Sequence, residues 1–496
     1  MAQLTKVFTM ALAIESSFLA RSSARWIVGA LIIVLLAIAN LPWQLDDYDQ
    51  AKQAFTSFEM VQQNHWLYQH TPNGWVATKP PLAGWTSAAI YFVTRSWELA
   101  WRLPSFLAAV ALLLLLQRAT ARAYGEAAGL IAAAAFGLNM FTLRLATLVR
   151  TDMLFTLILF LLGWQIWEKI RQRAPWNSRD RLLTFALLAA ALFIKGPIVY
   201  AFFLPALIAF QWRMRATGSP IAAWCGWLPW LVPFLFIAIW SAGGIFFVPE
   251  FSEHVMVREL VGRFGEEWHR PQPFYFYVPH LLHRFAPWSL LLLGFTALAW
   301  KGRERLRALS PETFWLIAWA GGGLILLSFI PSKRVDRIFP IVPPLCLLLT
   351  AQVAALQKFE RLGRVVALSC QIALISACLG LSSYAIMKIA DGYRAHRDAF
   401  VTFGNAVRQE AADRHWRYAA VGGEDEGMAL YLRRTEFLEL DDAVAQWAAQ
   451  KVDALVVPEE ELTELLPRLP GAVQSRIGLS GPAGSARRRY VFLIRS

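Results

Sequence analysis

LDDYDQAKQAF, EMVQQNHWLYQH and TPNGWVATKPPLAG, all between residues 45 and 84, form one polar connection after the first long apolar segment of the chain. A carboxylate pair at the end of a membrane helix, here Asp46 and Asp47, is costly to keep near hydrocarbon, so such acids are candidates for function. The alternative is a solvated loop whose acids only mark the end of the helix. Lys79, in the Lys-Pro-Pro tripeptide, supplies a cation on the same side of the membrane and favours the functional interpretation.

The composition is that of a membrane protein. The 496-residue chain is 57% hydrophobic and only 17% charged, and soluble domains could not bury so much apolar surface. A formal net charge of +13 would suggest nucleic-acid binding in a soluble protein, but most Lys and Arg residues lie in short loops between apolar segments, where they set orientation. We therefore expect no nucleic-acid partner. The cysteines fall in apolar runs and are interpreted as buried hydrophobic residues: Cys225, Cys346, Cys370 and Cys378.

Apolar segments that could cross a bilayer recur as far as residue 389, and their lengths predict about 11 to 13 spans. We expect an all-α polytopic membrane domain over residues 1–389, with outer loops at 44–102 and 244–274. The run 81–94 is interpreted as an interfacial helix, because counting it as a span would invert every later loop. The basic clusters of the short loops then face the cytoplasm, with the N-terminus inside and the C-terminus outside.

The segments left on the outer side carry many basic side chains. Charges kept there against the usual bias of Lys and Arg toward the cytoplasm indicate an anionic ligand, and a phosphate-bearing lipid fits this pattern. For Arg144 alone we favour the alternative of a side chain that snorkels to the interface. The other outer basic residues come from several loops: Lys79, Arg150, Arg263, His269, Arg270, Lys333, Arg334 and Arg337.

Another acid stands at the outer end of a predicted span. In LATLVRTDMLFTLILF (145–160), Arg150 and Asp152 precede a long apolar run. Thr151 and Asp152 could form a plain N-terminal cap of that helix, and taken alone the sequence favours this alternative. Because further acids are expected on the same side of the membrane, the functional interpretation becomes the better one.

After residue 389 the hydropathy falls, and helical and strand-like segments alternate. This alternation predicts a small α/β domain over residues 390–496 on the outer side. The segment has neither a dinucleotide glycine fingerprint nor a nucleophile elbow, so we interpret it as an accessory domain. The expected helices lie at 398–412, 441–450 and 459–469, and the expected strands at 417–423, 452–458 and 488–496.

Seven pieces of sequence, in this order, resemble the type C glycosyltransferases that use polyprenyl-phosphate sugars. The resemblance is greatest to the bacterial aminoarabinose transferases of lipid A, with protein O-mannosyltransferases as more distant relatives, and it covers nearly the whole membrane region. The matching pieces are Asp46-Asp47, Lys79-Pro80-Pro81-Leu82, Arg102-Leu103-Pro104-Ser105, Arg150-Thr151-Asp152, the turn Lys195-Gly196-Pro197, the segment from Glu259 to Phe264 with His269 and PFYFYVPHLLHRFAPW (273–288), and Ser332-Lys333 with Pro340 and Pro343-Pro344.

The chain departs from this family at the positions implied to bind a metal. The aminoarabinose transferases have a Glu just before Lys-Pro-Pro and a His after the Glu of the long loop, whereas this chain has Thr78 and Leu260. We therefore expect no metal and no other cofactor. His254 and His269 lie nearby, but a lone loop histidine is more often a hydrogen-bonding residue than a ligand. Arg337 replaces a family Tyr, which leaves the sugar and the acceptor open.

The resemblance implies an inverting glycosyltransferase of the bacterial inner membrane. It would move a sugar from an undecaprenyl-phosphate donor to a periplasm-facing acceptor such as lipid A or another envelope lipid or glycan. Inversion needs one carboxylate base, and the candidates are Asp46, Asp47 and Asp152. The donor phosphate would be bound by Lys79, Arg263, Lys333 and Arg337. Further substrate contacts are expected from Arg150, Glu259, His269 and Tyr275.

Two alternatives remain open from the sequence. An enzyme like the protein O-mannosyltransferases would need a peptide acceptor in the same cleft. A polyprenyl-phosphate lipid flippase or transporter belongs to a different class. The polar residues cluster in outer loops rather than at the membrane midplane, and matching halves with broken helices are not evident, which argues against transport.

Overall fold

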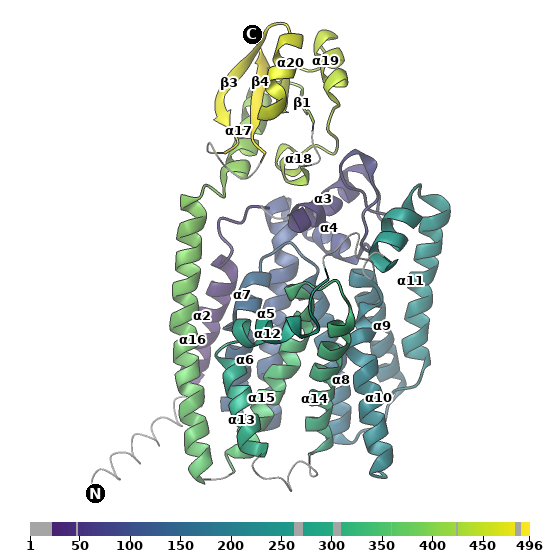
Figure 1. The fold of residues 1–496 in the computed structure, drawn as a ribbon, viewed down its shortest axis with the longest axis vertical. Helices are drawn as coiled ribbons and strands as arrows, with labels where there is room; N and C mark the ends of the chain where they lie inside the picture. Colours follow the sequence, from purple (N-terminus) through teal and green to yellow (C-terminus); the bar gives the residue numbers. More distant parts are fainter. Residues whose placement is uncertain are drawn as a thin grey trace, which may run out of the picture. The chain divides into compact units, whose positions relative to one another are not determined.

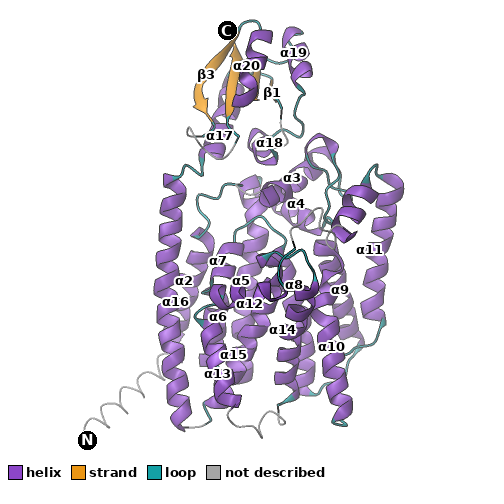
Figure 2. Cartoon of the chain, viewed as in Figure 1, coloured by secondary structure: helices purple, strands orange, loops and turns teal. Residues whose placement is uncertain are grey.

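The computed structural model describes residues 22–45, 48–261, 271–300, 309–358, 360–422, 425–481 and 488–496. These residues form two compact units. One comprises residues 22–39 and 103–386, and the other comprises residues 40–102 and 387–496. Helices dominate the described chain, and the strands belong to the second unit (Figure 2).

The first unit is built from helices, which confirms the predicted all-α membrane domain (Figure 1). Two helices, α5 and α16, continue into the second unit. The helices are α2 (Ser22–Ile38), α5 (Trp97–Tyr124), α6 (Glu126–Gly137), α7 (Met140–Leu145), α8 (Asp152–Gln172), α9 (Ser178–Lys195), α10 (Val199–Ala216), α11 (Leu228–Phe247), α12 (Tyr277–Arg284), α13 (Trp288–Trp300), α14 (Pro311–Phe329), α15 (Val342–Leu356) and α16 (Glu360–Arg394). Shorter helical segments lie at η2 (Gly196–Ile198), η3 (Ser252–Val261), η4 (Phe274–Phe276) and η6 (Val335–Ile341).

Within the described residues, 7 helical runs are long and apolar enough to cross a membrane. An eighth is added if α12 and α13, which meet at a bend of 105°, form one span. The chain is therefore a multi-pass membrane protein. This count is lower than the predicted number partly because α2 and α6, at 17 and 12 residues, are shorter than the ~20 residues of an ordinary span. The exact number of spans stays a prediction.

A second reason for the lower count is that the helical run 178–216 reverses direction. At one end of α9, Lys195 forms an ion pair with Asp152 at the start of α8, and toward the other end Gln165 donates a hydrogen bond to the Asp180 carbonyl (2.9 Å). Shortly after the turn, the Phe202 ring of α10 lies 6.2 Å from Phe155, again near the start of α8. The run is therefore two antiparallel segments, and the turn predicted at Lys195-Gly196-Pro197 is confirmed by this geometry. Gly196 has φ +72°, which favours glycine.

Small residues let the helices of this unit approach closely around aromatic rings. A Cβ atom on Gly163 of α8 would lie 2.2 Å from the Trp319 ring of α14, so only glycine fits there. The Trp319 ring also stacks with Phe160 and with Phe203 of α10, with centroids 6.4 and 5.9 Å apart. Close approach at small residues is typical of packed membrane helices. This packing holds α8, α10 and α14 together around the Trp319 ring.

The second unit combines the first outer segment with the C-terminal part of the chain. Its N-terminal helices are α3 (Tyr48–Gln63), α4 (Leu82–Thr94) and the first turns of α5. Helix α4 confirms that the run 81–94 is helical, while its position at a membrane interface stays a prediction. The C-terminal helices are α17 (Ala399–Asp413), α18 (Glu426–Leu432), α19 (Leu440–Ala448) and α20 (Leu462–Leu465), with short 3₁₀ turns on both sides of α20.

The strands form one mixed sheet in the order β1-β2-β4-β3, which confirms a small α/β fold. β1 (Tyr418–Ala420) is parallel to β2 (Ala454–Pro458), and β4 (Tyr490–Arg495) is antiparallel to both β2 and β3 (Ala472–Leu479). Helix α18 and strand β3 were not predicted. The helix expected over 459–469 is broken into short turns, with Pro467 inside the last of them.

Hydrogen bonds tie the first outer segment to the C-terminal part within this unit. The Asn73 side-chain oxygen accepts from the Phe437 backbone N–H at 2.8 Å, and the Tyr431 hydroxyl accepts from the Leu45 N–H at 2.8 Å. Lys388 also donates to the side chain of Asn40 (2.6 Å). Residues 40–102 and residues 387–496, which are separated in sequence by most of the membrane domain, therefore share one folded unit.

Candidate functional site

The N-terminus of α8 holds the acid that the sequence singled out. Asp152 is its first residue, is only 7% exposed, and forms an ion pair with Lys195, the last residue of α9. The Thr151 side chain makes no capping hydrogen bond, so the plain cap expected as an alternative is not formed by its hydroxyl. The carboxylate is instead aimed across the helix pair toward a cation. Because removing one partner would leave a buried charge, the pair requires both residues.

The loop that leads into α8 is fixed from α5. The Ser105 hydroxyl donates to the Leu148 carbonyl at 2.8 Å and also lies 3.3 Å from the Arg150 carbonyl. This contact gives the Arg-Leu-Pro-Ser sequence a physical role, because its last residue positions the backbone just before Asp152. The orientation of Asp152 is therefore set by helices α8 and α5 and by the hydrogen bond from Ser105 to the loop.

A second carboxylate lies beside this loop. Asp336, in η6, accepts a hydrogen bond from Arg150 at 2.7 Å, and Arg144 approaches the same oxygen at 3.8 Å. Among the residues that the structure describes, none makes a hydrogen bond to the other oxygen of this buried carboxylate. Arg150 and Asp152 are two residues apart, so the two ion pairs form one polar cluster at the start of α8. Arg144, interpreted from the sequence as a snorkelling side chain, has a charged neighbour in Asp336 and a side chain that is 40% exposed.

The turn before α15 contains two further predicted cations. Lys333 is 9% exposed and donates to the Gln272 carbonyl at 2.9 Å, while Arg337 donates to the Ser332 carbonyl at 2.5 Å. Desolvation by burial lowers the pKa of the Lys333 ammonium below its ordinary value. Within the described residues the Lys333 ammonium donates one hydrogen bond, and since an ammonium carries three donors, it has capacity for an anionic ligand.

In the second unit, Lys79 and the neighbouring Thr78 are both partly buried. Further back in this segment lies a cluster of Glu59, His65 and His70, whose ligand atoms fall within 4.8 Å of one another. His65 Nδ1 contacts Glu59 Oε1, and the backbone N–H of His70 donates to Glu59 Oε2 at 3.4 Å. These residue types could hold a metal ion, although the carboxylate already serves as a hydrogen-bond acceptor.

The structure brings some of the predicted residues together and leaves others undescribed. Arg150 and Asp152 share the cluster at α8, and Lys333 and Arg337 share one turn. Tyr275, in η4, is 65% exposed. Glu259 lies in the π-helical segment η3, but its side chain is outside the description. Asp46, Asp47, Arg263 and His269 lie outside the described residues.

Sequence reasoning missed two members of this cluster. Lys195 was noted only as part of a turn, and Asp336 was passed over among the basic residues of the segment 332–337. The available signal was charge complementarity, since one acid among Lys333, Arg334 and Arg337 requires a reason to be there. Likewise, a lysine at the end of an apolar helix indicates a nearby acid.

Comparisons with known proteins agree with this architecture. The family described as dolichyl-phosphate-mannose-protein mannosyltransferase matches residues 78–240. An undecaprenyl phosphate-alpha-4-amino-4-deoxy-L-arabinose arabinosyl transferase of Pectobacterium atrosepticum is 25% identical over 350 residues, covering 68% of this chain and 61% of that protein. The protein of the same name from Pectobacterium carotovorum subsp. carotovorum is 25% identical over 371 residues, covering 71% and 65%.

The fold is also that of a solved structure. The crystal structure of ArnT from Cupriavidus metallidurans bound to undecaprenyl phosphate matches with a TM-score of 0.63 at 17% identity, covering 94% of this chain and 97% of that chain. The expected resemblance to type C glycosyltransferases is thereby confirmed. The chain spans 61% and 65% of the length of the two curated relatives.

Proposed function

We propose that this chain, which shares its fold with ArnT, is an inverting glycosyltransferase that takes a sugar from a polyprenyl phosphate. The two curated relatives are named for transfer from undecaprenyl phosphate-linked aminoarabinose, and the solved structure contains undecaprenyl phosphate. The acceptor in this proposal is a lipid or glycan of the cell envelope, such as lipid A. The partners are therefore the lipid-linked donor, this acceptor and the bilayer.

The observation that carries the proposal is the ion pair between Asp152 and Lys195. Both residues lie in the segment 78–240 that matches the mannosyltransferase family, and both are largely buried at the ends of neighbouring helices. A carboxylate held in this way at a helix terminus is costly to maintain without a function. Its position beside Arg150 and Asp336 supplies a polar site that contains both acids and cations.

The reaction follows from these groups. An oxygen of the acceptor attacks the anomeric carbon of the donor sugar from the face opposite the lipid phosphate, and a carboxylate takes the acceptor proton. The bond between the anomeric carbon and the phosphate oxygen breaks, and the lipid phosphate leaves with the electron pair. Its additional negative charge is stabilised by nearby cations. The products are the glycosylated acceptor and the polyprenyl phosphate.

The residue roles remain those expected from the sequence, with one addition. Asp46 or Asp47 is the proposed base, and Asp152, held by Lys195, orients the acceptor or supports that base. Lys79, Arg263, Lys333 and Arg337 are proposed for the donor phosphate, and Arg150, Glu259, His269 and Tyr275 for substrate binding. No metal or other cofactor is part of this proposal, because Thr78 and Leu260 replace the two ligands expected from the related family.

The proposed location is the bacterial inner membrane, with the active site facing the periplasm. In this arrangement the N-terminus is cytoplasmic and residues 390–496 are periplasmic. The distribution of Lys and Arg among the short loops supports this orientation. A cysteine-labelling experiment with an impermeant reagent on a variant such as Ser496→Cys would test it, since labelling of intact spheroplasts requires an outer C-terminus.

A protein acceptor is the second candidate function. The family that matches residues 78–240 is described as transferring mannose from dolichyl phosphate to protein, which favours a hydroxyl of a peptide as the acceptor. Both candidates use a sugar linked to a polyprenyl phosphate as the donor. They differ in the class of acceptor, and one experiment separates them on that ground.

The experiment uses the full chain in nanodiscs, a panel of radiolabelled polyprenyl-phosphate sugars, and separate lipid, glycan and peptide acceptors. We expect label to leave the carrier with the wild-type protein and not with Asp46→Asn or Asp152→Asn. Asp180→Asn is the matched control, because Asp180 pairs with Lys169 at the opposite ends of α8 and α9. Label that never leaves the carrier, together with labelled lipid that crosses a proteoliposome bilayer, would replace the transferase with a transporter.

A further inference from the structure

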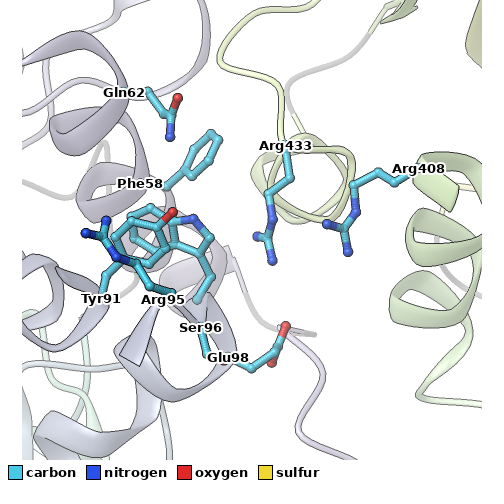
Figure 3. A pocket seen from close by; sticks show the side chains of 9 residues that line it. Phe58, Gln62, Tyr91, Arg95, Ser96, Glu98, Arg408 and Arg433 are labelled. Carbon is cyan, nitrogen blue, oxygen red and sulfur yellow. The ribbon is translucent and has the colours of Figure 1, made fainter. Parts of the chain in front are cut away.

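A cavity of about 460 Å³ lies within the second unit, between the outer-segment helices and the C-terminal helices (Figure 3). Its size is in the range of small-molecule sites. Figure 3 shows two walls, with aromatic and amide side chains on one side and two arginines on the other. The lining residues are Phe58, Gln62, Tyr91, Arg95, Ser96, Trp97, Glu98, Arg408 and Arg433.

One wall of the cavity is a packed aromatic layer. The Tyr91 ring stacks on Trp97 with centroids 3.9 Å apart and an interplanar angle of 14°, and Phe58 meets Trp97 edge-on at 5.3 Å. Trp97 and Phe58 are buried, whereas Tyr91 is partly exposed and forms the accessible part of the layer. The C–H face of a sugar ring packs well against such an apolar, rigid surface.

The opposite wall carries Arg408 of α17 and Arg433, which follows α18. Both guanidinium groups point toward the floor of the cavity, where Glu98 lies (Figure 3). Arg433 has φ +56°, a left-handed conformation at the end of α18 that directs its side chain into the cavity. Arg95 is on the aromatic side with its guanidinium turned away from these two.

The two guanidinium groups contact neutral partners: Arg408 donates to the Asn405 side chain, and Arg433 lies over the Trp101 ring at 5.3 Å. Within the described chain neither Arg408 nor Arg433 makes an ion pair, and the buried Arg408 Nε has no hydrogen-bond partner. Arg433 donates to the Leu430 carbonyl at 2.9 Å, a neutral acceptor. The carboxylate of Glu98 is already bound by Arg102 at 2.5 Å. Two cations, Arg408 and Arg433, therefore face the cavity, while the acid that lines it, Glu98, is already paired with Arg102.

The energetics of Arg433 agree with this geometry. Burial and the neighbouring Arg408 lower the pKa of Arg433 to about 10. A guanidinium is hard to deprotonate, so the shift measures an unfavourable environment for the charge. An anion placed between the two arginines would offset both causes, by supplying opposite charge and charge-assisted hydrogen bonds.

We propose that this cavity binds a phosphorylated saccharide, with its phosphate held by Arg408 and Arg433 and its sugar ring against the layer of Tyr91. Identifying this saccharide as part of the acceptor rests on the proposed function. The binding itself does not, because the residues belong to the second unit and the cavity would hold its ligand without any transfer. Planar, forked guanidinium groups suit bidentate recognition of phosphate.

The test is calorimetric titration of the full chain in nanodiscs with glucose 1-phosphate, glucose and inorganic phosphate. We expect glucose 1-phosphate to bind more tightly than either of the other two. Arg408→Gln and Arg433→Gln should each weaken its binding by about tenfold, because each removes a charged donor. Arg433→Lys keeps the charge and should lose less than Arg433→Gln.

The matched control is Arg414→Gln, since Arg414 follows the same helix but does not line the cavity and its side chain is 59% exposed. The affinity of Arg414→Gln for glucose 1-phosphate should equal that of the wild type. Affinities are compared only among variants whose melting temperature equals that of the wild type. Equal affinities for glucose 1-phosphate and inorganic phosphate would overturn the saccharide part of the proposal. Loss of stability without any change in binding would show that the arginines only hold the unit together.

A transfer assay on the same preparations separates the two proposals. Saccharide phosphate binding that depends on Arg408 and Arg433, in a protein that transfers no sugar, would retain the cavity and reject the glycosyltransferase. Transfer by a protein that binds no saccharide phosphate would retain the glycosyltransferase and reject the cavity. We expect both activities, with Arg433→Gln raising the KM for a phosphorylated acceptor more than it lowers kcat.

Discussion

Lys195 and Asp152 form an ion pair between the last residue of α9 and the first residue of α8, with side chains 17% and 10% exposed. A second pair, Lys169 with Asp180, joins the same two helices at their opposite ends, with side chains each 16% exposed. Two similar ion pairs therefore connect one helix pair. Only the first lies beside the Arg150 and Asp336 cluster, so the second provides an internal reference for purely structural effects.

We predict that Asp152→Asn and Lys195→Met each destabilise the protein more than the double variant does. A single substitution leaves one largely buried charge without its partner, which typically costs about 3–5 kcal/mol, whereas the double variant removes both charges. The melting temperatures of the three variants in detergent give the order of their stabilities. All three variants should be inactive in transfer if the pair is functional.

The corresponding variants of Lys169 and Asp180 are the control for this prediction. They should show a similar order of stabilities but retain transfer. If the double variant at Asp152 and Lys195 transfers sugar at the wild-type rate, the pair is only a structural link, and the residue roles proposed for it are wrong.

Much of the fold was predictable because it depends on local patterns. The turn at Lys195-Gly196-Pro197 follows from a glycine and a proline between two apolar runs, and the buried strands β2 and β4 follow from short runs of apolar residues. Strand β3 was missed because it pairs only with β4 at the edge of the sheet and shows no clear alternation in burial. Helix α18 was missed because all seven residues are buried, which removes any amphipathic period.

The candidate site was less predictable because its contacts are long-range. Arg150 and Asp336 are 186 residues apart in sequence, and neither helical period nor motif spacing connects them. The cavity of Arg408 and Arg433 joins residues from α3, α4, α5 and α17 with the residue that follows α18, so it exists only once the second unit has folded. Sequence patterns identified several charged residues but could not assign their partners.

We predict that Gly163→Ala destabilises the membrane unit. The added Cβ would meet the Trp319 ring at 2.2 Å, and a ring stacked on Phe160 and Phe203 has little room to move. Overpacking of this kind costs about 1–3 kcal/mol. Thermal unfolding measures the loss. Gly321→Ala is the control, because its Cβ would have no atom within 4 Å, and an unchanged melting temperature for Gly163→Ala would contradict the packing described here.

We predict that donor binding weakens at alkaline pH through Lys333. Because desolvation lowers the pKa of this ammonium from 10.5, it loses its proton and its attraction for phosphate at a lower pH than an ordinary lysine. Affinity should therefore fall as pH rises through this lowered pKa. The folded state binds fewer protons than the unfolded state between the two pKa values, so stability should rise with pH over the same window.

Lys333→Arg tests this assignment, since arginine stays protonated throughout the accessible range. Its donor affinity, measured by titration with a polyprenyl phosphate, should remain flat where that of the wild type falls. An equal alkaline loss in both proteins would show that another group titrates and that Lys333 does not bind the donor phosphate.

We predict that prolonged treatment with EDTA leaves sugar transfer unchanged. Thr78 and Leu260 offer no strong ligand at the positions implied to bind a metal in the related family. In the cluster of Glu59, His65 and His70, the carboxylate already accepts from the His70 N–H and contacts His65. The measurement combines a transfer assay with elemental analysis of the treated protein. If EDTA abolishes transfer, zinc restores it, and His65→Ala prevents the restoration, the cluster is a metal site and the proposed mechanism without a metal is wrong.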